Sequence, residues 1–504
     1  MESRTRNSGL NIVYSLLVKL VTAISGLILP RIFIPTYGSE VNGLIASISQ
    51  FLSYVTFLEM GIGGVMRASL YKPLAMRDVK SVSSIIKAAQ IFYKKIGGIS
   101  CIYIAGLCIL YPILVKSSFG AGYIAVIILA SSISLLLRYF ISAPYSQLID
   151  ADQHIRICNL LDSLILVGNI IVVYILASFN ADVRIVKLAS ALVFAVRPII
   201  LSIYVTRHYP LIKGVEPNSN AIRQRWNGAV HDFAFFVHKS TDIAVLTLFA
   251  SLKAVSVYAV YNAIVSGVES IAVSFSNSSA ASIGNMLVTE NEKVVNERFN
   301  LIEFIQNSII VILFTTSYLL IIPFISLYTE GMSDANYIQP LFGTILIVAE
   351  GIFCIGSLYG ILYRAANKFK ETQKGAIAES VINLTLSLAL VSRFELVGVA
   401  IGTACAVAVR CIYNVIYLSK NVLNRPVKKF IRLISVDAGI AASSIMLCKL
   451  LFSYDIVGWG DWIVRGIVTF AVTLVVAIAF SMLFYRDELK QTWMLLMRVA
   501  KNRS

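Results

Sequence analysis

The chain has 504 residues, of which 58% are hydrophobic and only 14% charged, and its formal net charge is +16. Soluble proteins average about 45–50% apolar and about 25% charged residues, so a soluble chain of this composition could not cover its own core. Few Pro (11), Gly (29) and Cys (7) exclude collagen-like, disordered and disulfide-framework proteins. The sequence predicts a polytopic membrane protein with no nucleic-acid partner, because most basic residues flank apolar runs.

Fourteen apolar runs are long enough to cross a bilayer as helices. A spanning helix needs about 20 mostly apolar residues, and lipid offers no hydrogen-bond partners to irregular backbone. In chain order the runs are 9–34, 42–65, 85–113, 122–143, 158–178, 184–206, 229–249, 254–283, 300–328, 337–363, 374–392, 396–420, 430–451 and 461–485. We therefore predict an all-α fold with about 14 transmembrane helices.

The basic residues are distributed unevenly over the segments that connect these runs. With the N-terminus in the cytosol, 31 of the 43 Lys and Arg residues fall on cytosolic segments, eight on external segments and four within spans. An excess of Lys and Arg marks cytoplasmic loops, so the sequence predicts that both termini are cytosolic. The external loops are short, and no cysteine has the spacing of a metal ligand. We therefore expect no metal and no cofactor.

Two landmarks recur at nearly the same interval. The tripeptide Ala-Val-Arg occurs at 195–197 and 408–410, and Asn169 is matched by Asn383. This interval divides the spans into six, six and two. Both six-span units begin in the cytosol, so the repeat is parallel, with a pseudo-two-fold axis along the membrane normal, as in transporters that bind substrate between their halves. The expected domains are an N-lobe (1–210), a cytosolic linker (211–228), a C-lobe (229–420), and spans 13 and 14 with a cytosolic tail (421–504).

Eight ionisable residues lie near the middle of predicted spans. Such groups are costly at this depth unless they pair or face a polar cavity, so they form the candidate site, which contains no catalytic residue. The cations are Lys19, Arg197, Lys239 and Arg410, and the carboxylates are Glu59, Asp242, Glu269 and Glu350. A cavity lined by the cations suits an anionic ligand, and a diphosphate offers paired oxygens to Arg and point contacts to Lys.

Simpler interpretations stay open for several of these residues. Lys239 and Asp242 are three residues apart and can pair on one helix face. Arg197 and Arg410 can extend along the helix toward the cytosolic interface. Glu59 can hold the end of a neighbouring helix instead of a ligand.

The carboxylates also offer a route for ion coupling. Glu269 is the first choice for a proton-binding group, because it lies mid-span in a serine-rich helix that we expect to line water. Asp242 is the second choice, since nearby Lys239 favours its ionised form. The alternative is that all four carboxylates only neutralise the basic residues.

Residues 12–67 resemble the opening of Wzx-type polysaccharide flippases of the multidrug/oligosaccharidyl-lipid/polysaccharide exporter superfamily. The matching features are Arg31, the Tyr37–Gly38 turn, Gly43, Glu59–Gly61 and Arg67. Residues 241–264, around Asp242 and Tyr258, resemble the seventh and eighth spans of this family. Residues 379–404, around Asn383 and Gly398, resemble its eleventh and twelfth spans. Many relatives have an aspartate where this chain has Glu59.

The resemblance implies a function in polysaccharide synthesis. The protein would move an undecaprenyl-diphosphate-linked oligosaccharide across a bacterial plasma membrane by alternating access, for capsule, exopolysaccharide or O-antigen. The implied partners are this lipid-linked substrate, plasma-membrane lipid, a polysaccharide polymerase and glycosyltransferases. Spans 13 and 14 resemble the lipid-tail groove helices of the related peptidoglycan-precursor flippase.

Two other functions remain as alternatives. A cation-coupled drug exporter of the same superfamily is expected to have a mainly acidic cavity, which the four basic residues argue against. A membrane-embedded polysaccharide polymerase or ligase would need a sizeable external loop with catalytic groups. The sequence contains no nucleophile–base triad, metal cluster or glycine-rich phosphate loop, so we expect that the protein is not an enzyme.

Overall fold

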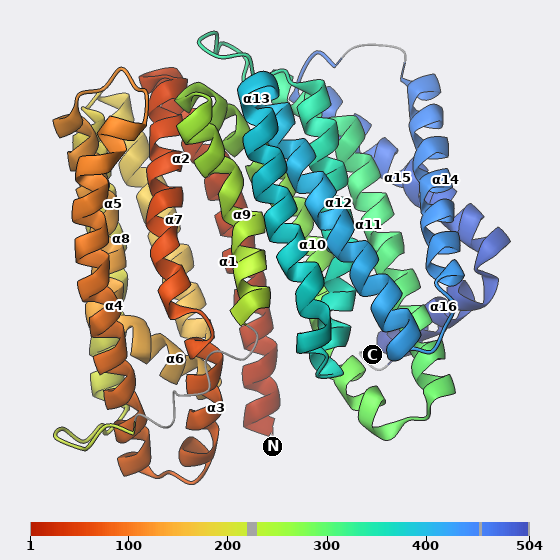
Figure 1. Cartoon of the computed structure of the whole chain (residues 1–504), viewed down its shortest axis with the longest axis horizontal. Helices are drawn as coiled ribbons and strands as arrows, with labels where there is room; N and C mark the ends of the chain where they lie inside the picture. Colours follow the sequence, from red (N-terminus) through yellow and green to blue (C-terminus); the bar gives the residue numbers. More distant parts are fainter. Residues whose placement is uncertain (1, 219–228, 453–455, 502–504) are drawn as a thin grey trace. The chain divides into compact units, whose positions relative to one another are not determined.

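The computed structural model describes residues 2–218, 229–452 and 456–501, and within these ranges every regular element is a helix (Figure 1). The chain forms two compact units, Met1–Val260 and Tyr261–Ser504, which divide within helix α10 (Leu252–Thr289). The predicted all-α fold is confirmed.

The first unit is built from long helices that pack side by side. α7 packs against α1 and α8, and α5 packs against α4 and α8. Its elements are α1 (Glu2–Tyr37), α2 (Ser39–Ser53), η1 (Tyr54–Glu59), α3 (Ile62–Ala75), α4 (Val79–Leu114), α5 (Ala121–Leu137), η2 (Arg138–Ser142), α6 (Ala143–Ala151), α7 (Arg156–Ser178), α8 (Val183–His208), α9 (Ala229–Phe249) and the first turns of α10.

The second unit continues with the rest of α10 and repeats much of this packing. α11 packs against α12, and α12 packs against α13, as α4, α5 and α8 do in the first unit. α14 and α15 then pack against each other and against α11. The elements are α11 (Glu292–Tyr328), α12 (Pro340–Ala365), α13 (Phe369–Asn421), α14 (Lys428–Leu451), α15 (Trp459–Phe484) and α16 (Arg486–Lys501).

Twelve of the fourteen predicted spans correspond to one helix or part of one, and the second and fourth each combine more than one helical element. Twelve helices among the described residues are long and apolar enough to cross a membrane. One of them, α13, contains two passes, because its backbone at Glu395 leaves helical geometry (φ 42°, ψ −116°) between the arms 369–394 and 396–421. α9 has the length of a pass, but it carries Asp232, Lys239 and Asp242 and is therefore less apolar. Together these account for fourteen passes.

Two predicted spans are not regular α-helices. The second, expected as one helix over 42–65, ends its α-helical part at Ser53, continues as the 3-10 helix η1, and turns at Gly61. Gly61 has φ 76°, a conformation that glycine adopts without steric cost. The fourth span contains the five-residue π-helix η2. Single-turn π-helices inside α-helices are frequent at functional sites.

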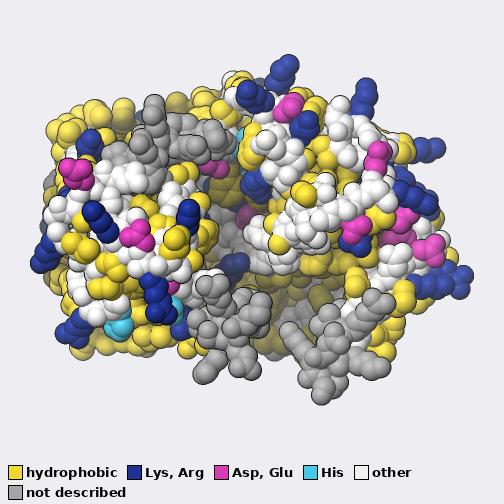
Figure 2. All heavy atoms as spheres, turned by 90° about the horizontal axis from the view of Figure 1, so that it is seen from below, with side chains coloured by type: hydrophobic (Ala, Val, Ile, Leu, Met, Phe, Trp, Pro, Cys, Tyr) yellow, Lys and Arg dark blue, Asp and Glu magenta, His cyan; other side chains and the backbone are white. Residues whose placement is uncertain are grey.

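The predicted topology can be tested at two exposed positions. Asn218, in the described part of the linker, donates its backbone N–H to Ser84 O (3.2 Å), and Ser333 lies in the connection between α11 and α12. Figure 2 shows many Lys and Arg side chains on the face predicted to be cytosolic. On a cysteine-free background, we expect an impermeant thiol reagent applied to intact cells to label a cysteine at 333 but not one at 218. Both should react after permeabilisation, and labelling at 218 in intact cells would reverse the orientation.

Candidate functional site

Two of the predicted cations form ion pairs with carboxylates that the sequence analysis did not select. Arg197 on α8 binds Asp162 on α7 through two hydrogen bonds, one of them from Nη2 to Oδ2 at 3.1 Å. Arg410 on the second arm of α13 donates from Nη1 to Glu379 Oε2 on the first arm, at 2.5 Å. Both pairs join the fifth span to the sixth span of their repeat. The two arginine charges are therefore compensated within their own units.

The two pairs differ in exposure. The side chains of Arg197 and Asp162 are 24% and 32% exposed, whereas those of Arg410 and Glu379 are 17% and 2% exposed. Removing one partner of a buried pair costs far more than removing one partner of an exposed pair. Arg410 is therefore the more strongly held arginine.

Glu59 forms an ion pair at the place where the second and fourth spans leave regular α-helical geometry. At the end of η1, it accepts a hydrogen bond from Arg138 Nη2, at 2.6 Å, and Arg138 begins η2. The Arg138 guanidinium also lies 5.5 Å from the ring centroid of Tyr139. The irregular turns of the two spans therefore meet through an ion pair, as in the interpretation of Glu59 as a residue that holds a neighbouring helix.

Asp242 is 3% exposed and joins α9 to α10. Its Oδ2 accepts a hydrogen bond from the Tyr258 hydroxyl at 2.9 Å. Lys239 is half-buried on the same helix, and Lys19 has an exposed side chain on α1. All three predicted site residues belong to the first unit, together with Glu59 and Arg197.

The remaining predicted residues lie in the second unit with Arg410. Glu350 on α12 is 5% exposed, and Glu269 on α10 is half-buried. Three serines near Glu269 donate their hydroxyls to carbonyl oxygens three or four residues earlier in α10 (Ser266, Ser270 and Ser274). Because such serines are satisfied by their own helix, serine content alone does not mark a water-lined face.

Hydrogen bonds at equivalent positions support the internal repeat. In the first unit Gln90 on α4 donates to the Tyr145 hydroxyl on α6, at 3.1 Å. In the second unit the Tyr359 hydroxyl on α12 donates to Glu303 on α11. Gln90 and Glu303 are 213 positions apart, and Tyr145 and Tyr359 are 214 positions apart. These are the intervals that separate the sequence landmarks of the two repeats. The same two spans are thus joined at the same place in each repeat.

Helices α2 and α10 approach each other closely within the first unit. Asn42 Nδ2 donates to Ser256 Oγ at 2.8 Å, and these positions are 214 residues apart. Equivalent positions of two repeats can touch only near the axis that relates them. A Cβ on neighbouring Gly43 would lie 1.7 Å from Leu252 O, so only glycine permits this approach.

The sequence analysis missed the acidic partners Asp162, Glu379 and Glu303, and it gave no role to Arg425, which lies between the predicted spans 396–420 and 430–451. In the structure the Arg425 guanidinium binds Glu303 with both terminal nitrogens, at 2.7 and 2.8 Å, and both side chains are at least 95% buried. For Arg197 and Arg410, their equivalent positions in the two repeats were the one feature of the sequence that indicated an acidic partner on the preceding span.

Solved structures of membrane transporters match this fold over most of the chain. One is the lipid II flippase MurJ in an inward closed conformation, with a TM-score of 0.71, 16% identity, and coverage of 95% of this chain and 99% of MurJ. The MATE multidrug transporter DinF-BH in complex with R6G gives a TM-score of 0.60 and 15% identity, over 82% of this chain and 95% of its own.

An inward-facing MATE family transporter of the MOP superfamily gives a TM-score of 0.56 and 12% identity, over 81% of this chain and 95% of its own. No protein-family model and no curated protein matches the sequence. At these identities the comparisons establish the fold. The protein is a multi-pass membrane protein with the fold of these transporters, which confirms the resemblance at the level of the fold.

Proposed function

We propose that this chain, which has the fold of the MurJ flippase and the MATE exporters, is a flippase for undecaprenyl-diphosphate-linked oligosaccharides. It would act in the bacterial plasma membrane with both termini in the cytosol, and it would supply capsule, exopolysaccharide or O-antigen synthesis. Alternating access would move the lobes 1–210 and 229–420, joined by the linker 211–228. The polysaccharide polymerase and glycosyltransferases are the proposed partners.

The extent of the structural match carries this proposal. The MurJ match leaves about 25 residues of this chain uncovered, far fewer than lie between Lys428 and Lys501. It must therefore extend into the C-terminal helices α14–α16. The two MATE matches leave close to a fifth of the chain uncovered, a share similar to the segment 421–504. Fourteen passes favour a lipid-linked substrate over a drug.

The charges inside the spans suit a diphosphate. We assign the contacts with it to all four intramembrane cations, and the ammonium groups of Lys19 and Lys239 would act as point charges on phosphate oxygens. Arg197 and Arg410 already bind carboxylates, so a diphosphate that recruits them must replace Asp162 or Glu379. Such an exchange would link substrate binding to the contact between neighbouring helices.

The carboxylates have separate proposed roles. Glu269 is the proposed proton-binding group, and Asp242, which accepts a hydrogen bond from Tyr258, is the second candidate. Glu59 holds η1 to η2 through Arg138. Glu350, which is buried in the second unit, is proposed as a further carboxylate of the transport cavity.

A transport assay with two substrates tests the proposal. We expect vesicles containing the purified protein to move a fluorescent undecaprenyl-diphosphate oligosaccharide between leaflets and not to accumulate R6G, the compound bound to DinF-BH. The lipid should be followed by quenching of the outer leaflet and the dye by fluorescence in the lumen. Protein-free vesicles provide the control. Movement of R6G without movement of the lipid would replace the flippase by the drug exporter.

A further inference from the structure

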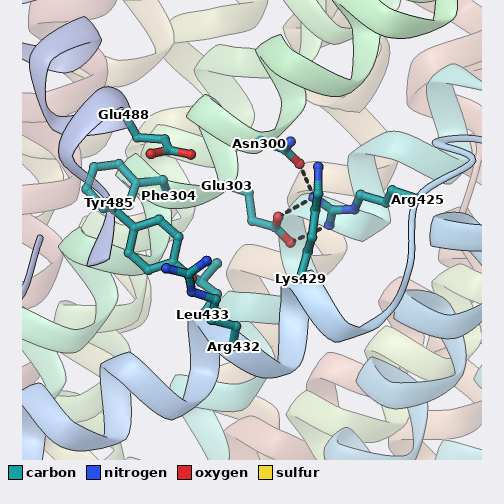
Figure 3. A pocket seen from close by; sticks show the side chains of 9 residues that line it. All are labelled: Asn300, Glu303, Phe304, Arg425, Lys429, Arg432, Leu433, Tyr485 and Glu488. Carbon is teal, nitrogen blue, oxygen red and sulfur yellow. Dashed lines mark hydrogen bonds and ion pairs between the residues drawn. The ribbon is translucent and has the colours of Figure 1, made fainter. Parts of the chain in front are cut away.

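A pocket in the second unit is lined in part by the Arg425–Glu303 pair and by none of the eight predicted site residues. It encloses about 490 Å³, including the part open to solvent. Figure 3 shows its walls: the first third of α11 with Asn300 and Glu303, the start of α14 with Lys429 and Arg432, and the junction of α15 and α16 with Tyr485. All three walls belong to parts of helices that the predicted topology places toward the cytosolic side.

Positive charge is in excess in this pocket. Arg425, at its base, is compensated by Glu303. Lys429 and Arg432 are three residues apart on α14 and line one side, and Glu488 is the remaining acid. Among the described residues Lys429 has no ion-pair partner within 4 Å. Two cations thus face the space against one carboxylate.

The Arg432 guanidinium is held in place while most of its N–H groups stay available. Its Nη2 donates to Phe484 O at 3.0 Å, and the group lies 5.4 Å from the ring centroid of Tyr485. An arginine fixed in this way can present further N–H donors to a ligand without losing more side-chain freedom.

Two buried polar atoms at the pocket have no hydrogen-bond partner among the described residues. They are Arg425 Nε, in a side chain that is almost fully buried, and the Tyr485 hydroxyl. Buried polar groups are nearly always hydrogen-bonded. Burial raises the pKa of Tyr485 to about 12, so this hydroxyl remains protonated and can donate. These two donors leave unsatisfied polarity beside the pocket, which favours an anion over an apolar ligand there.

The surroundings of the pocket are those of a membrane interface. α16 follows the last span and carries exposed apolar side chains, including Trp493, Met494 and Leu495. A short helix with one apolar and one charged face lies in the plane of the interface, and tryptophan is enriched at that level. Ile431, between Lys429 and Arg432, is 58% exposed and offers an apolar surface beside the pocket.

We propose that this pocket binds the phosphate group of an anionic phospholipid from the leaflet on the predicted cytosolic side. Lys429 and Arg432 contact the phosphate oxygens, and the acyl chains lie along the exposed apolar side chains of α14. Basic pockets between spans on the cytoplasmic side are suited to anionic headgroups. The site is distinct from the intramembrane charges and does not depend on which substrate is transported.

Lipid binding to the purified full chain tests this assignment. Native mass spectrometry in detergent should show phosphatidylglycerol binding more tightly than phosphatidylcholine with the same acyl chains. The double variant Lys429→Gln/Arg432→Gln should bind phosphatidylglycerol at least tenfold more weakly. Lys428→Gln is the matched control, because Lys428 has the same charge, is next in sequence and does not line the pocket. It should bind like the parent.

A gain of binding separates a local effect from misfolding. Glu488→Gln removes the acid that faces the pocket, so it should bind phosphatidylglycerol more tightly than the parent, a result that misfolded protein cannot give. Equal binding of the two lipids by the parent, or equal binding of phosphatidylglycerol by the parent and the double variant, would overturn the proposal. Displacement of the lipid by millimolar inorganic phosphate would reassign the pocket to a soluble anion.

Discussion

Replacing Arg425 by alanine is expected to destabilise the protein by about 3–5 kcal/mol, the usual cost of leaving a buried charge without its partner. The Arg425 guanidinium binds both oxygens of Glu303 and donates to the Tyr359 hydroxyl at 2.8 Å. Burial lowers the pKa of Arg425, but the hydrogen bonds and charge of Glu303 more than offset this, so its pKa lies above the ordinary value. Arg425 is therefore charged in the folded protein.

Thermal unfolding in detergent measures this effect. Arg184→Ala is the control, because Arg184 and Asp182 form an ion pair whose side chains are 48% and 37% exposed, and such a pair contributes about 0–1 kcal/mol. The double variant Arg425→Met/Glu303→Met should lose less stability than Arg425→Ala, since it leaves no buried charge. If Arg425→Ala unfolds at the same temperature as Arg184→Ala, the pair does not stabilise the fold.

Replacing Lys19 or Lys239 by alanine is expected to reduce substrate flipping tenfold or more, while the protein remains in the membrane at its normal level. A hydrogen bond to a charged group contributes about 1.5–3 kcal/mol, and each lysine is proposed to make at least one such bond to the diphosphate. Arg410→Lys should be only partly tolerated, because lysine lacks the planar fork that is proposed to bind the diphosphate.

Polysaccharide export in cells and flipping in vesicles both measure this prediction. Lys116→Ala is the matched control, since Lys116 is an exposed lysine in the connection between α4 and α5 and should be replaceable without loss. Full export by Lys19→Ala would remove that residue from the proposed site. Lys239→Ala would then be the remaining test of a cationic contact with the diphosphate.

The sequence by itself determined the architecture of this protein. The number and approximate limits of the spans follow from the length of apolar runs, because each run must satisfy its own backbone hydrogen bonds in lipid. The repeat was also visible, since Asn169 and Asn383, and Arg197 and Arg410, keep nearly the same interval. Both features depend on short segments of chain and on their order.

The partners of the charged residues were decided only by the tertiary structure. Asp162 and Arg197 are 35 residues apart, Glu379 and Arg410 are 31 apart, and Glu303 and Arg425 are 122 apart. Periodicity within one helix reports neighbours three or four residues away, but it contains no information on which turns of two different helices face each other.

The irregular turns in the second and fourth spans depended on tertiary structure for the same reason. Hydropathy cannot distinguish an α-helical turn from a 3-10 or π turn of the same residues. At η1 and η2 the irregular backbone places Glu59 opposite Arg138. Packing between helices selects such a turn when it allows two charges to meet, because an unpaired charge at this depth costs several kcal/mol.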